Sequence, residues 1–412
     1  MDPLLLAALA SAVVAGVLTS VLVPPVVKLS RALRVLDHPD EPRKVQATAV
    51  PRLGGAAIGV GLAGASLLGL LAGWREWGAT LPRADLVALP VATALVFLVG
   101  LVDDLFGVTP GKKFVVQILA AWLLVRVGWT LQVLKLPLIG EVDLGMWGGL
   151  VAILWIVGVT NALNLIDGLD GLAGGVAAII AASLLFYSLV QNNRGSVVLM
   201  AAIFGACVGF LRHNWEPAKV FMGDSGSLTL GFLLGAISLH SSFKATAAVA
   251  ILVPILALGL PVIDTLLVMA VRFFEGEGSP LKSRVGRMFR GDRQHLHHLL
   301  SNLTVHHRKV VVAIYAVVAL FCVMAIAVAL TGFDTLGIVF VAVQIGAVVV
   351  MRRLGLARQA KRLAQERVGT LRTGLPGWLR RGAPATPASP GPPDAAPPSA
   401  PAARKGAPLE TR

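Results

Sequence analysis

Four clusters of acidic, amide and histidine side chains interrupt a sequence that is otherwise strongly apolar. The first is "LVDDLFG", with adjacent carboxylates at Asp103 and Asp104, and the second is "NALNLIDGLDG", from Asn161 to Gly171. The third is "GDSGS", which contains Asp224, and the fourth is "GDRQHLHHLL", which contains three histidines. Burying one charge in hydrocarbon costs about 2.5–3.5 kcal/mol, so adjacent carboxylates at its edge require a cationic partner.

The side chains in these clusters predict a hard divalent cation and a phosphate ligand. Carboxylate and amide oxygens favour Mg²⁺, with Mn²⁺ as the alternative, over zinc. The two cysteines lie in apolar segments and form no CxxC motif, so no disulfide or zinc site is indicated. Glycines in "GDSGS" allow backbone N–H groups to approach phosphate oxygens, and histidines near arginines suit a diphosphate. Together the clusters fit metal-assisted phosphoryl transfer at a membrane surface.

Each cluster, taken alone, also has a purely structural explanation. "GDSGS" would serve as a helix N-cap, and "DGLDG" would form a tight turn with glycine in left-handed positions. In the first polar loop Arg43 and Lys44 could hold phosphate, but a cationic loop is ordinary on the inner side of a membrane. Asp264 lies within an apolar segment, where either a functional role or a hydrogen bond to a neighbouring helix would explain it.

Long apolar segments must place these clusters on one side of a bilayer. The chain is 56% hydrophobic with a mean hydropathy of +0.78, whereas soluble domains are nearer 45–50% apolar. About 20 apolar residues span a bilayer as a helix, so we predict an all-α polytopic membrane protein with about eleven transmembrane helices. Residues 129–147 are amphipathic and receive no assignment. The predicted spans are 4–27, 53–73, 85–102, 113–128, 148–163, 172–190, 196–211, 227–242, 246–271, 310–331 and 335–351.

The distribution of Lys and Arg predicts the orientation. Thirty of the 36 basic residues fall in the loops and tail that carry the polar clusters. The positive-inside rule makes that side cytoplasmic, with the N-terminus outside, the C-terminus inside and an active-site cleft facing the cytoplasm. The net charge of +14 follows from this bias, so it does not indicate nucleic acid as a partner.

Composition divides the chain into three regions. Residues 1–351 form the multi-span domain. Residues 352–381 predict a basic amphipathic helix on the anionic inner leaflet. Residues 382–412 are rich in Pro and Ala and are expected to be disordered.

The order of the motifs resembles one enzyme family. "RKVQATAVPRLGG", "DDLFG", "NALNLIDGLDGLAGG", "FMGDSGSLTLGF" and "DRQHLHH" follow one another as in the polyprenyl-phosphate N-acetylhexosamine-1-phosphate transferases. The similarity runs from the first span to about residue 350. It implies an eleven-span, Mg²⁺-dependent enzyme that moves a sugar-1-phosphate from a UDP-sugar to a phosphorylated polyprenol and releases UMP.

The resemblance also implies roles for individual residues. Asp224 is similar to the principal metal ligand, and Asn164 to an asparagine near the metal and diphosphate. Asp103 and Asp104 resemble the pair that engages the lipid phosphate and metal, with the identity of any base left open. The other implied contacts are Asp167 and Asp170 at the nucleotide, Lys113 at a phosphate, and His295, His297 and His298 at the sugar or diphosphate.

Details of the motifs favour one branch of that family. "DDLFG" and "HLHH" resemble the polysaccharide-initiating GlcNAc-1-phosphate branch rather than the peptidoglycan branch, which uses UDP-MurNAc-pentapeptide. Gln46 departs from the pattern, because a histidine is common there. The expected partners are undecaprenyl phosphate (or decaprenyl phosphate), a UDP-N-acetylhexosamine and a bacterial plasma membrane. The exact sugar, the polymer and a homodimeric state stay open, and a transporter is the alternative outside the family.

Overall fold

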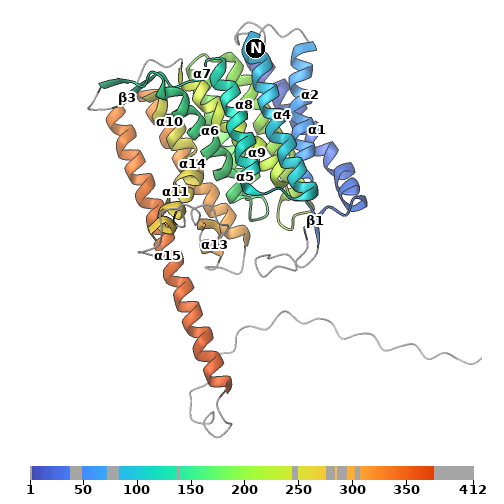
Figure 1. The fold of residues 1–412 in the computed structure, drawn as a ribbon, viewed down its shortest axis with the longest axis vertical. Helices are drawn as coiled ribbons and strands as arrows, with labels where there is room; N and C mark the ends of the chain where they lie inside the picture. The colour runs from blue at the N-terminus through green and yellow to red at the C-terminus, as the bar shows by residue number, and fades with distance from the viewer. Residues whose placement is uncertain are drawn as a thin grey trace, which may run out of the picture. The chain divides into compact units, whose positions relative to one another are not determined.

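The structure is a computed structural model that describes residues 2–37, 49–71, 83–136, 140–243, 249–274, 284, 295–301 and 307–374. Its contacts separate two units, Met1–Ala360 and Lys361–Arg412. The helical bundle and the candidate site belong to the first unit (Figure 1).

Helices make up most of the described chain, and seven of these helices are long and apolar enough to cross a membrane. This finding confirms a multi-span helical protein, while the number eleven and the orientation stay predictions. The seven are α1 Pro3–Ala32, α4 Arg83–Phe106, α6 Trp147–Ile166, α7 Leu172–Val190, α8 Arg194–Asn214, α14 His307–Thr331 and α15 Asp334–Gly374. The other helices are α2 Gly54–Leu71, α5 Pro110–Arg126, α9 Gly223–Phe243, α10 Val249–Ala257, α11 Gly259–Phe274 and α13 Leu296–Ser301.

Two short antiparallel pairs of strands qualify the all-α prediction. Strand β1 (Leu36–Asp37) pairs with β2 (Val50–Pro51) just before α2. Strand β3 (Val133–Leu136) pairs with β4 (Gly140–Asp143), within the segment that received no assignment from the sequence. The fold is therefore mostly helical, with small hairpins in its connections.

The predicted span 246–271 is two helices in the structure. Helix α10 ends at Ala257 and α11 begins at Gly259. Pro261 has no N–H to donate to the Ala257 carbonyl, and its ring crowds that same carbonyl. The helical hydrogen-bond ladder is therefore interrupted at the position where α10 ends.

Helix α9 is the centre of the bundle. It contacts α2, α4, α6, α7, α8 and α10, and most of its side chains are buried. A helix that is apolar on all sides belongs in a core rather than at a surface. A Cβ at Gly100 of α4 would lie 2.6 Å from the Asp224 carbonyl oxygen, so glycine allows α4 to pack against the start of α9. This contact brings the acidic end of α4 beside Asp224.

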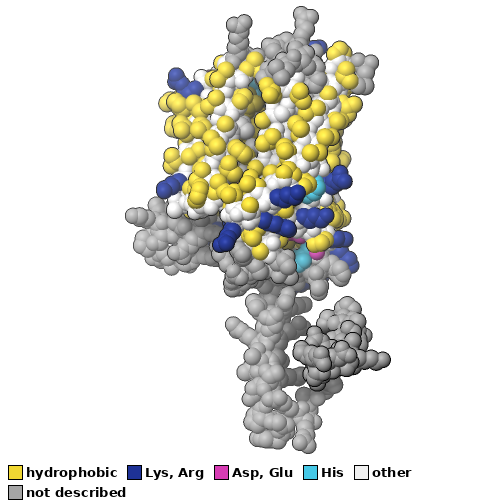
Figure 2. Space-filling view, turned by 90° about the vertical axis from the view of Figure 1, so that its right-hand side faces the viewer, with side chains coloured by type: hydrophobic (Ala, Val, Ile, Leu, Met, Phe, Trp, Pro, Cys, Tyr) yellow, Lys and Arg dark blue, Asp and Glu magenta, His cyan; other side chains and the backbone are white. Residues whose placement is uncertain are grey.

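The surface of the bundle is apolar along most of its length. Figure 2 shows hydrophobic side chains over one face, with Lys and Arg side chains gathered mainly toward one end. On α1, for example, Leu9, Val13 and Val17 are each more than half exposed. Such a surface suits contact with lipid hydrocarbon rather than with water.

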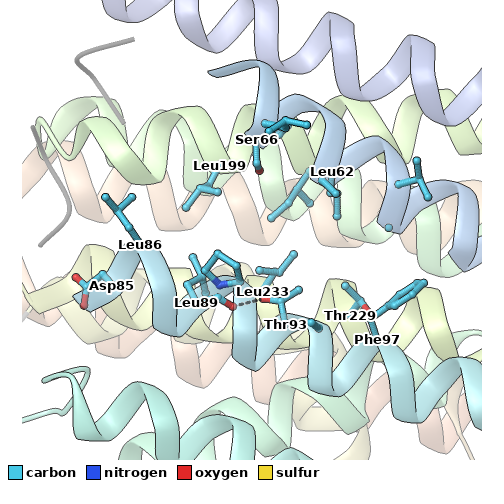
Figure 3. Close-up of a pocket in the computed structure, with 18 residues that line it drawn as sticks. Leu62, Ser66, Asp85, Leu86, Leu89, Thr93, Phe97, Leu199, Thr229 and Leu233 are labelled. Atoms are coloured by element: carbon cyan, nitrogen blue, oxygen red, sulfur yellow. Dashed lines mark hydrogen bonds between the residues drawn. The ribbon is translucent and has the colours of Figure 1, made fainter. Parts of the chain in front are cut away.

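An apolar cavity of about 490 Å³ lies among α2, α4, α8 and α9 (Figure 3). Its wall includes Leu62, Leu89, Phe97, Leu199 and Leu233. Thr93 also lines it, and its hydroxyl donates to the Leu89 carbonyl one turn earlier in α4 at 2.7 Å. None of its lining residues comes from the four polar clusters. The cavity is therefore distinct from the candidate site.

Candidate active site

Three carboxylates from two helices converge at one end of the bundle. Asp103 and Asp104 lie in the last turn of α4, and Asp224 lies in the first turn of α9. Each of the three residues offers one carboxylate oxygen, and these three oxygens all lie within 4.8 Å of one another. The structure therefore brings together two of the polar clusters that the sequence predicted to share a site. We call these three residues the acidic cluster.

Asp104 joins α4 to the beginning of α9. Its Oδ1 accepts a hydrogen bond from the Asp224 backbone N–H at 2.8 Å. Its Oδ2 accepts from both the backbone N–H and the hydroxyl of Ser225, at 3.0 and 2.6 Å. A carboxylate at a helix N-terminus satisfies otherwise unpaired N–H groups and interacts favourably with the helix dipole. Asp104 therefore caps the helix that carries Asp224.

Glycine is required at position 223 by both conformation and space. Its φ is +71°, in the left-handed region that L side chains rarely adopt. A Cβ there would lie 2.6 Å from both Asp104 carboxylate oxygens and would overlap the Arg52 carbonyl oxygen. Gly223 therefore lets three chain segments meet at the acidic cluster.

Two cationic side chains flank the acidic cluster. The Lys113 ammonium, from the first turns of α5, lies 2.7 Å from Asp224 Oδ2 and 3.4 Å from Asp103 Oδ1. The Arg52 guanidinium lies 3.9 Å from Asp103 Oδ2 and 3.8 Å from Asp104 Oδ1. Sequence reasoning named Lys113 but missed Arg52, although Arg52 falls within the quoted first-loop motif "VPRLGG". Its place in that quoted motif was the available signal.

Asn164 connects α6 to the acidic cluster. Its Nδ2 donates to Asp224 Oδ1 at 3.1 Å and to Ser227 Oγ at 2.9 Å. The Ser227 hydroxyl in turn donates to the Gly223 carbonyl at 2.9 Å. Both Asp224 oxygens thus have a donor, one from Asn164 and the other from Lys113. This network fixes the direction of the Asp224 carboxylate.

Asp167 and Asp170 extend the negative charge beyond these three carboxylates. Burial, followed by repulsion from Asp224, Asp104 and Asp170, raises the pKa of Asp167 to about 8. Burial also raises the pKa of Asp170, although that carboxylate accepts a hydrogen bond from the Ala218 N–H at 2.8 Å. Burial is the larger cause and the repulsion adds to it, so the ionised form of Asp167 is disfavoured beside the acidic cluster.

Several residues predicted from the sequence lie elsewhere or outside the described residues. Asn161 donates to Gln117 of α5 and to the Val157 carbonyl, at 2.5 and 2.7 Å, so its amide joins two helices. His295 is buried against Asp264, with Nδ1 3.1 Å from Asp264 Oδ2. Lys44 lies outside the described residues, and His297 and His298 lie on α13 but their side chains are not among those described.

The site can bind an anion and a cation together. Oxygens of Asp103, Asp104 and Asp224 offer hard ligands, while Lys113 and Arg52 supply donors for phosphate oxygens. Gly223 has no side chain, so only main-chain atoms occupy this position beside the carboxylates at the start of α9. This combination suits chemistry in which a phosphate group changes partners.

Comparisons with known proteins show the family to which this chain is similar. The family model described as glycosyl transferase family 4 matches residues 86–242. A Bacillus subtilis protein named "Probable undecaprenyl-phosphate N-acetylglucosaminyl 1-phosphate transferase" is 32% identical over 317 residues, covering 76% of this chain and 83% of the relative.

Two further relatives represent the two branches. A Mycobacterium tuberculosis "Decaprenyl-phosphate N-acetylglucosaminephosphotransferase" is 34% identical over 328 residues, covering 73% of this chain and 77% of the relative. A Caldicellulosiruptor bescii "Phospho-N-acetylmuramoyl-pentapeptide-transferase" is 34% identical over 292 residues, covering 67% of this chain and 82% of the relative. The matched family region contains Asp103, Asp104, Lys113, Asn164 and Asp224.

Proposed function

This chain belongs to glycosyl transferase family 4, and from that premise we propose that it transfers N-acetylglucosamine-1-phosphate from UDP-GlcNAc to a polyprenyl phosphate. The products are a polyprenyl-diphospho-sugar and UMP, and the reaction begins a cell-envelope polysaccharide. The observation that carries the proposal is the acidic cluster, held beside Lys113 and Arg52 at one end of an apolar helical bundle.

We place the site at the cytoplasmic face of a bacterial plasma membrane. By sequence, most Lys and Arg residues fall in the loops and tail on the predicted side that carries the polar clusters. The positive-inside rule assigns that side to the cytoplasm. A nucleotide-sugar made in the cytoplasm would then reach the site from water, and a lipid phosphate would reach it from the inner leaflet.

The residues present fit Mg²⁺. Three carboxylates lie beside two cationic side chains, and repulsion from Asp224 and Asp104 adds to burial in raising the pKa of Asp167. A divalent cation would relieve this repulsion, and carboxylate oxygens are ligands that Mg²⁺ accepts. We propose Asp224 and Asp103 as its ligands, with Asn164 orienting Asp224. When bound, Mg²⁺ would neutralise charge on the diphosphate of the donor.

In the proposed reaction an oxygen of the lipid phosphate attacks the β-phosphorus of the UDP-sugar. A new P–O bond forms to the lipid phosphate, the bond between the β-phosphorus and the bridging oxygen breaks, and UMP leaves with that oxygen. Lys113 and Arg52 hold phosphate oxygens near the acidic cluster. The lipid phosphate is already an anionic nucleophile, so the protein's main contribution is to position the two phosphates.

The second candidate reaction uses UDP-MurNAc-pentapeptide as donor. It is favoured by the relatives that carry the name phospho-N-acetylmuramoyl-pentapeptide-transferase, which are also about one third identical to this chain. The chemistry at phosphorus would be the same, and only the sugar would differ. The donor must therefore be identified by experiment.

The test is UMP release by the purified chain in detergent. Undecaprenyl phosphate and decaprenyl phosphate are offered separately with UDP-GlcNAc, UDP-GalNAc or UDP-MurNAc-pentapeptide, with Mg²⁺, with Mn²⁺ and with EDTA. Asp224→Asn removes the central carboxylate and is expected to abolish turnover. Asp143→Asn, on the exposed hairpin strand β4, is the matched control and is expected to be as active as the wild type.

Each result has a defined meaning. Metal-dependent UMP release from UDP-GlcNAc supports the proposal, and release only from the pentapeptide donor assigns the second branch. Equal release in the presence of EDTA would contradict the metal ligands proposed here. Folded wild-type protein that releases no UMP from any donor would contradict the transferase proposal.

A further inference from the structure

A buried ionic cluster joins three segments that are far apart in the sequence. Asp264 of α11 is 2% exposed, and its Oδ1 lies 2.7 Å from the Arg352 Nη1 of α15. Its Oδ2 lies 3.1 Å from His295 Nδ1. The Leu296 backbone N–H, at the first residue of α13, lies 3.2 and 3.1 Å from the two Asp264 oxygens. One carboxylate therefore holds α11, α13 and α15 together.

Arg352 explains how a carboxylate is tolerated at this place. An ionised acid inside an apolar bundle is costly unless a cation and hydrogen bonds compensate it. Arg352 is itself only 6% exposed, so the two charges compensate each other away from water. Asp264 thus accepts directional hydrogen bonds from Arg352 and Leu296 and makes a third contact with His295.

Asp264 fixes both the ring of His295 and the start of α13. Because a carboxylate only accepts hydrogen bonds, Nδ1 is the nitrogen of His295 that carries a proton. On α13, Leu296 and Leu299 are buried, and a Cβ at Gly355 of α15 would lie 2.8 Å from the Leu299 Cβ. Helices α11 and α15 together therefore determine where the short histidine-bearing helix lies.

We infer that Asp264, held by Arg352, is a positioning residue that sets the histidine segment 295–298 for binding of the nucleotide-sugar donor. The inference rests on the proposed function, because the donor is the ligand that this segment would contact. Asp264 itself touches no substrate in this proposal. Its role is to place α13, as buried carboxylates orient histidines in many metal sites.

The kinetic test compares Asp264→Asn with Gly259→Ala. Asparagine preserves the shape of Asp264 but removes its charge. Alanine at 259 would press on Gln344 of α15, so it perturbs the α11–α15 packing without touching Asp264. We expect Asp264→Asn to raise the KM for the UDP-sugar about 10- to 100-fold, the range seen when an orienting partner of a histidine is lost. The kcat and the KM for the lipid phosphate should change less than threefold.

A merely structural role predicts a different pattern. Partial unfolding lowers the active fraction, so kcat falls while both KM values stay constant. Gly259→Ala is expected to show that pattern. The same pattern in Asp264→Asn, or kinetics equal to the wild type, would overturn the inference.

A second variant separates stability from positioning. Asp264→Asn leaves Arg352 buried without its carboxylate, whereas Asp264→Asn/Arg352→Gln removes both charges. We expect the double variant to regain thermal stability relative to Asp264→Asn while its KM for the UDP-sugar stays high. Recovery of both stability and KM would overturn the positioning role.

Hydrogen exchange supplies a readout that does not depend on catalysis. Peptides covering residues 295–301 should exchange faster in Asp264→Asn than in the wild type and in Gly259→Ala. Unchanged exchange would overturn the inference even if the wild type had no transferase activity. Wild-type protein that is inactive with every donor, but shows this exchange difference, would contradict the proposed function alone.

Discussion

Asp104→Asn tests whether Asp104 holds α9 in place or serves only as one more acidic ligand. In the structure its two oxygens receive three hydrogen bonds, two from the Asp224 and Ser225 backbone N–H groups and one from the Ser225 hydroxyl. Asparagine has one carbonyl oxygen, and its NH₂ group would face at least one of these donors. The cap on α9 would therefore be broken in either orientation of the amide.

The sign of the effect depends on two opposing contributions. A buried N–H left without an acceptor costs about 1–3 kcal/mol, and the lost charge at a helix N-terminus adds about 0.3–1 kcal/mol. Removing the charge also relieves repulsion from Asp103 and Asp224, at about 4 kcal/mol per pair near 4 Å for an effective dielectric of 20. It equally removes the attraction to Arg52 at 3.8 Å. Burial raises the pKa of Asp104 to about 6, so near pH 5 the folded protein carries little charge there and the charge terms drop out. The hydroxyl oxygen of a neutral carboxyl can still accept a hydrogen bond whereas an amide NH₂ cannot, so at pH 5 we expect a destabilisation of about 1–3 kcal/mol.

Thermal unfolding of the purified protein in detergent with EDTA measures this effect. Ser225→Ala is the matched control, because it removes the hydroxyl donor but leaves both backbone hydrogen bonds, for a loss of about 1 kcal/mol. We expect Asp104→Asn to unfold at a lower temperature than Ser225→Ala, and both below the wild type. If Asp104→Asn instead stabilised the metal-free protein, Asp104 would be mainly a repulsive ligand, and our account of the cap would be refuted.

Three further substitutions or deletions test the rest of the site. Asp167→Asn should stabilise the metal-free protein, because the pKa of Asp167 is raised to about 8 and the folded state therefore disfavours its ionised form. This stabilisation should be absent below about pH 4 and should grow toward pH 8 by at most roughly 1.4 kcal/mol per pH unit. Thermal unfolding at several pH values would measure it, and a stabilisation that shrinks with rising pH would contradict the prediction. Lys113→Met should lower kcat/KM about 10- to 100-fold through loss of a charge-assisted contact at 2.7 Å, measured by UMP release, and wild-type kinetics would exclude Lys113 from the site. Truncation after Arg372 should leave kcat and both KM values unchanged, because the acidic cluster, Asp264 and Arg352 all precede it, and a loss of turnover would assign the tail a catalytic role.

The convergence of the polar clusters could be predicted because hydropathy and order along the chain determine it. Apolar runs of about 20 residues mark the helices, and acids at their ends meet when the ends face the same side. Asp103, Asp104, Asn164 and Asp224 were predicted on this basis and do lie together. Their roles in catalysis stay a proposal.

The partners of buried charges could not be predicted because they depend on which helices are neighbours. Asp264 pairs with Arg352, which comes from the segment 352–381 that was expected to lie on the inner leaflet. Helix α15 continues without interruption from Asp334 to Gly374, so the composition change at residue 352 is not a boundary of the helix. The contact between His295 Nδ1 and Asp264 could likewise not be predicted, and the assignment of His295 to substrate stays a prediction.

The arrangement of Asp104 implies that contacts from the protein itself contribute to the order of the acidic cluster. A metal could hold three carboxylates together by itself, but here the Asp104 carboxylate is already bonded to the N-terminus of α9, and the Asp224 carboxylate to Lys113 and Asn164. Each of these contacts comes from the protein and orders a carboxylate without the ion. A preorganised site loses little conformational entropy when the cation binds. Little of the cation's binding free energy is then used to order its carboxylate ligands, and more of it can stabilise the bound diphosphate. A site of this kind should bind its cation weakly in the absence of donor and more tightly with it, since Lys113 can then turn from Asp224 toward the added phosphate.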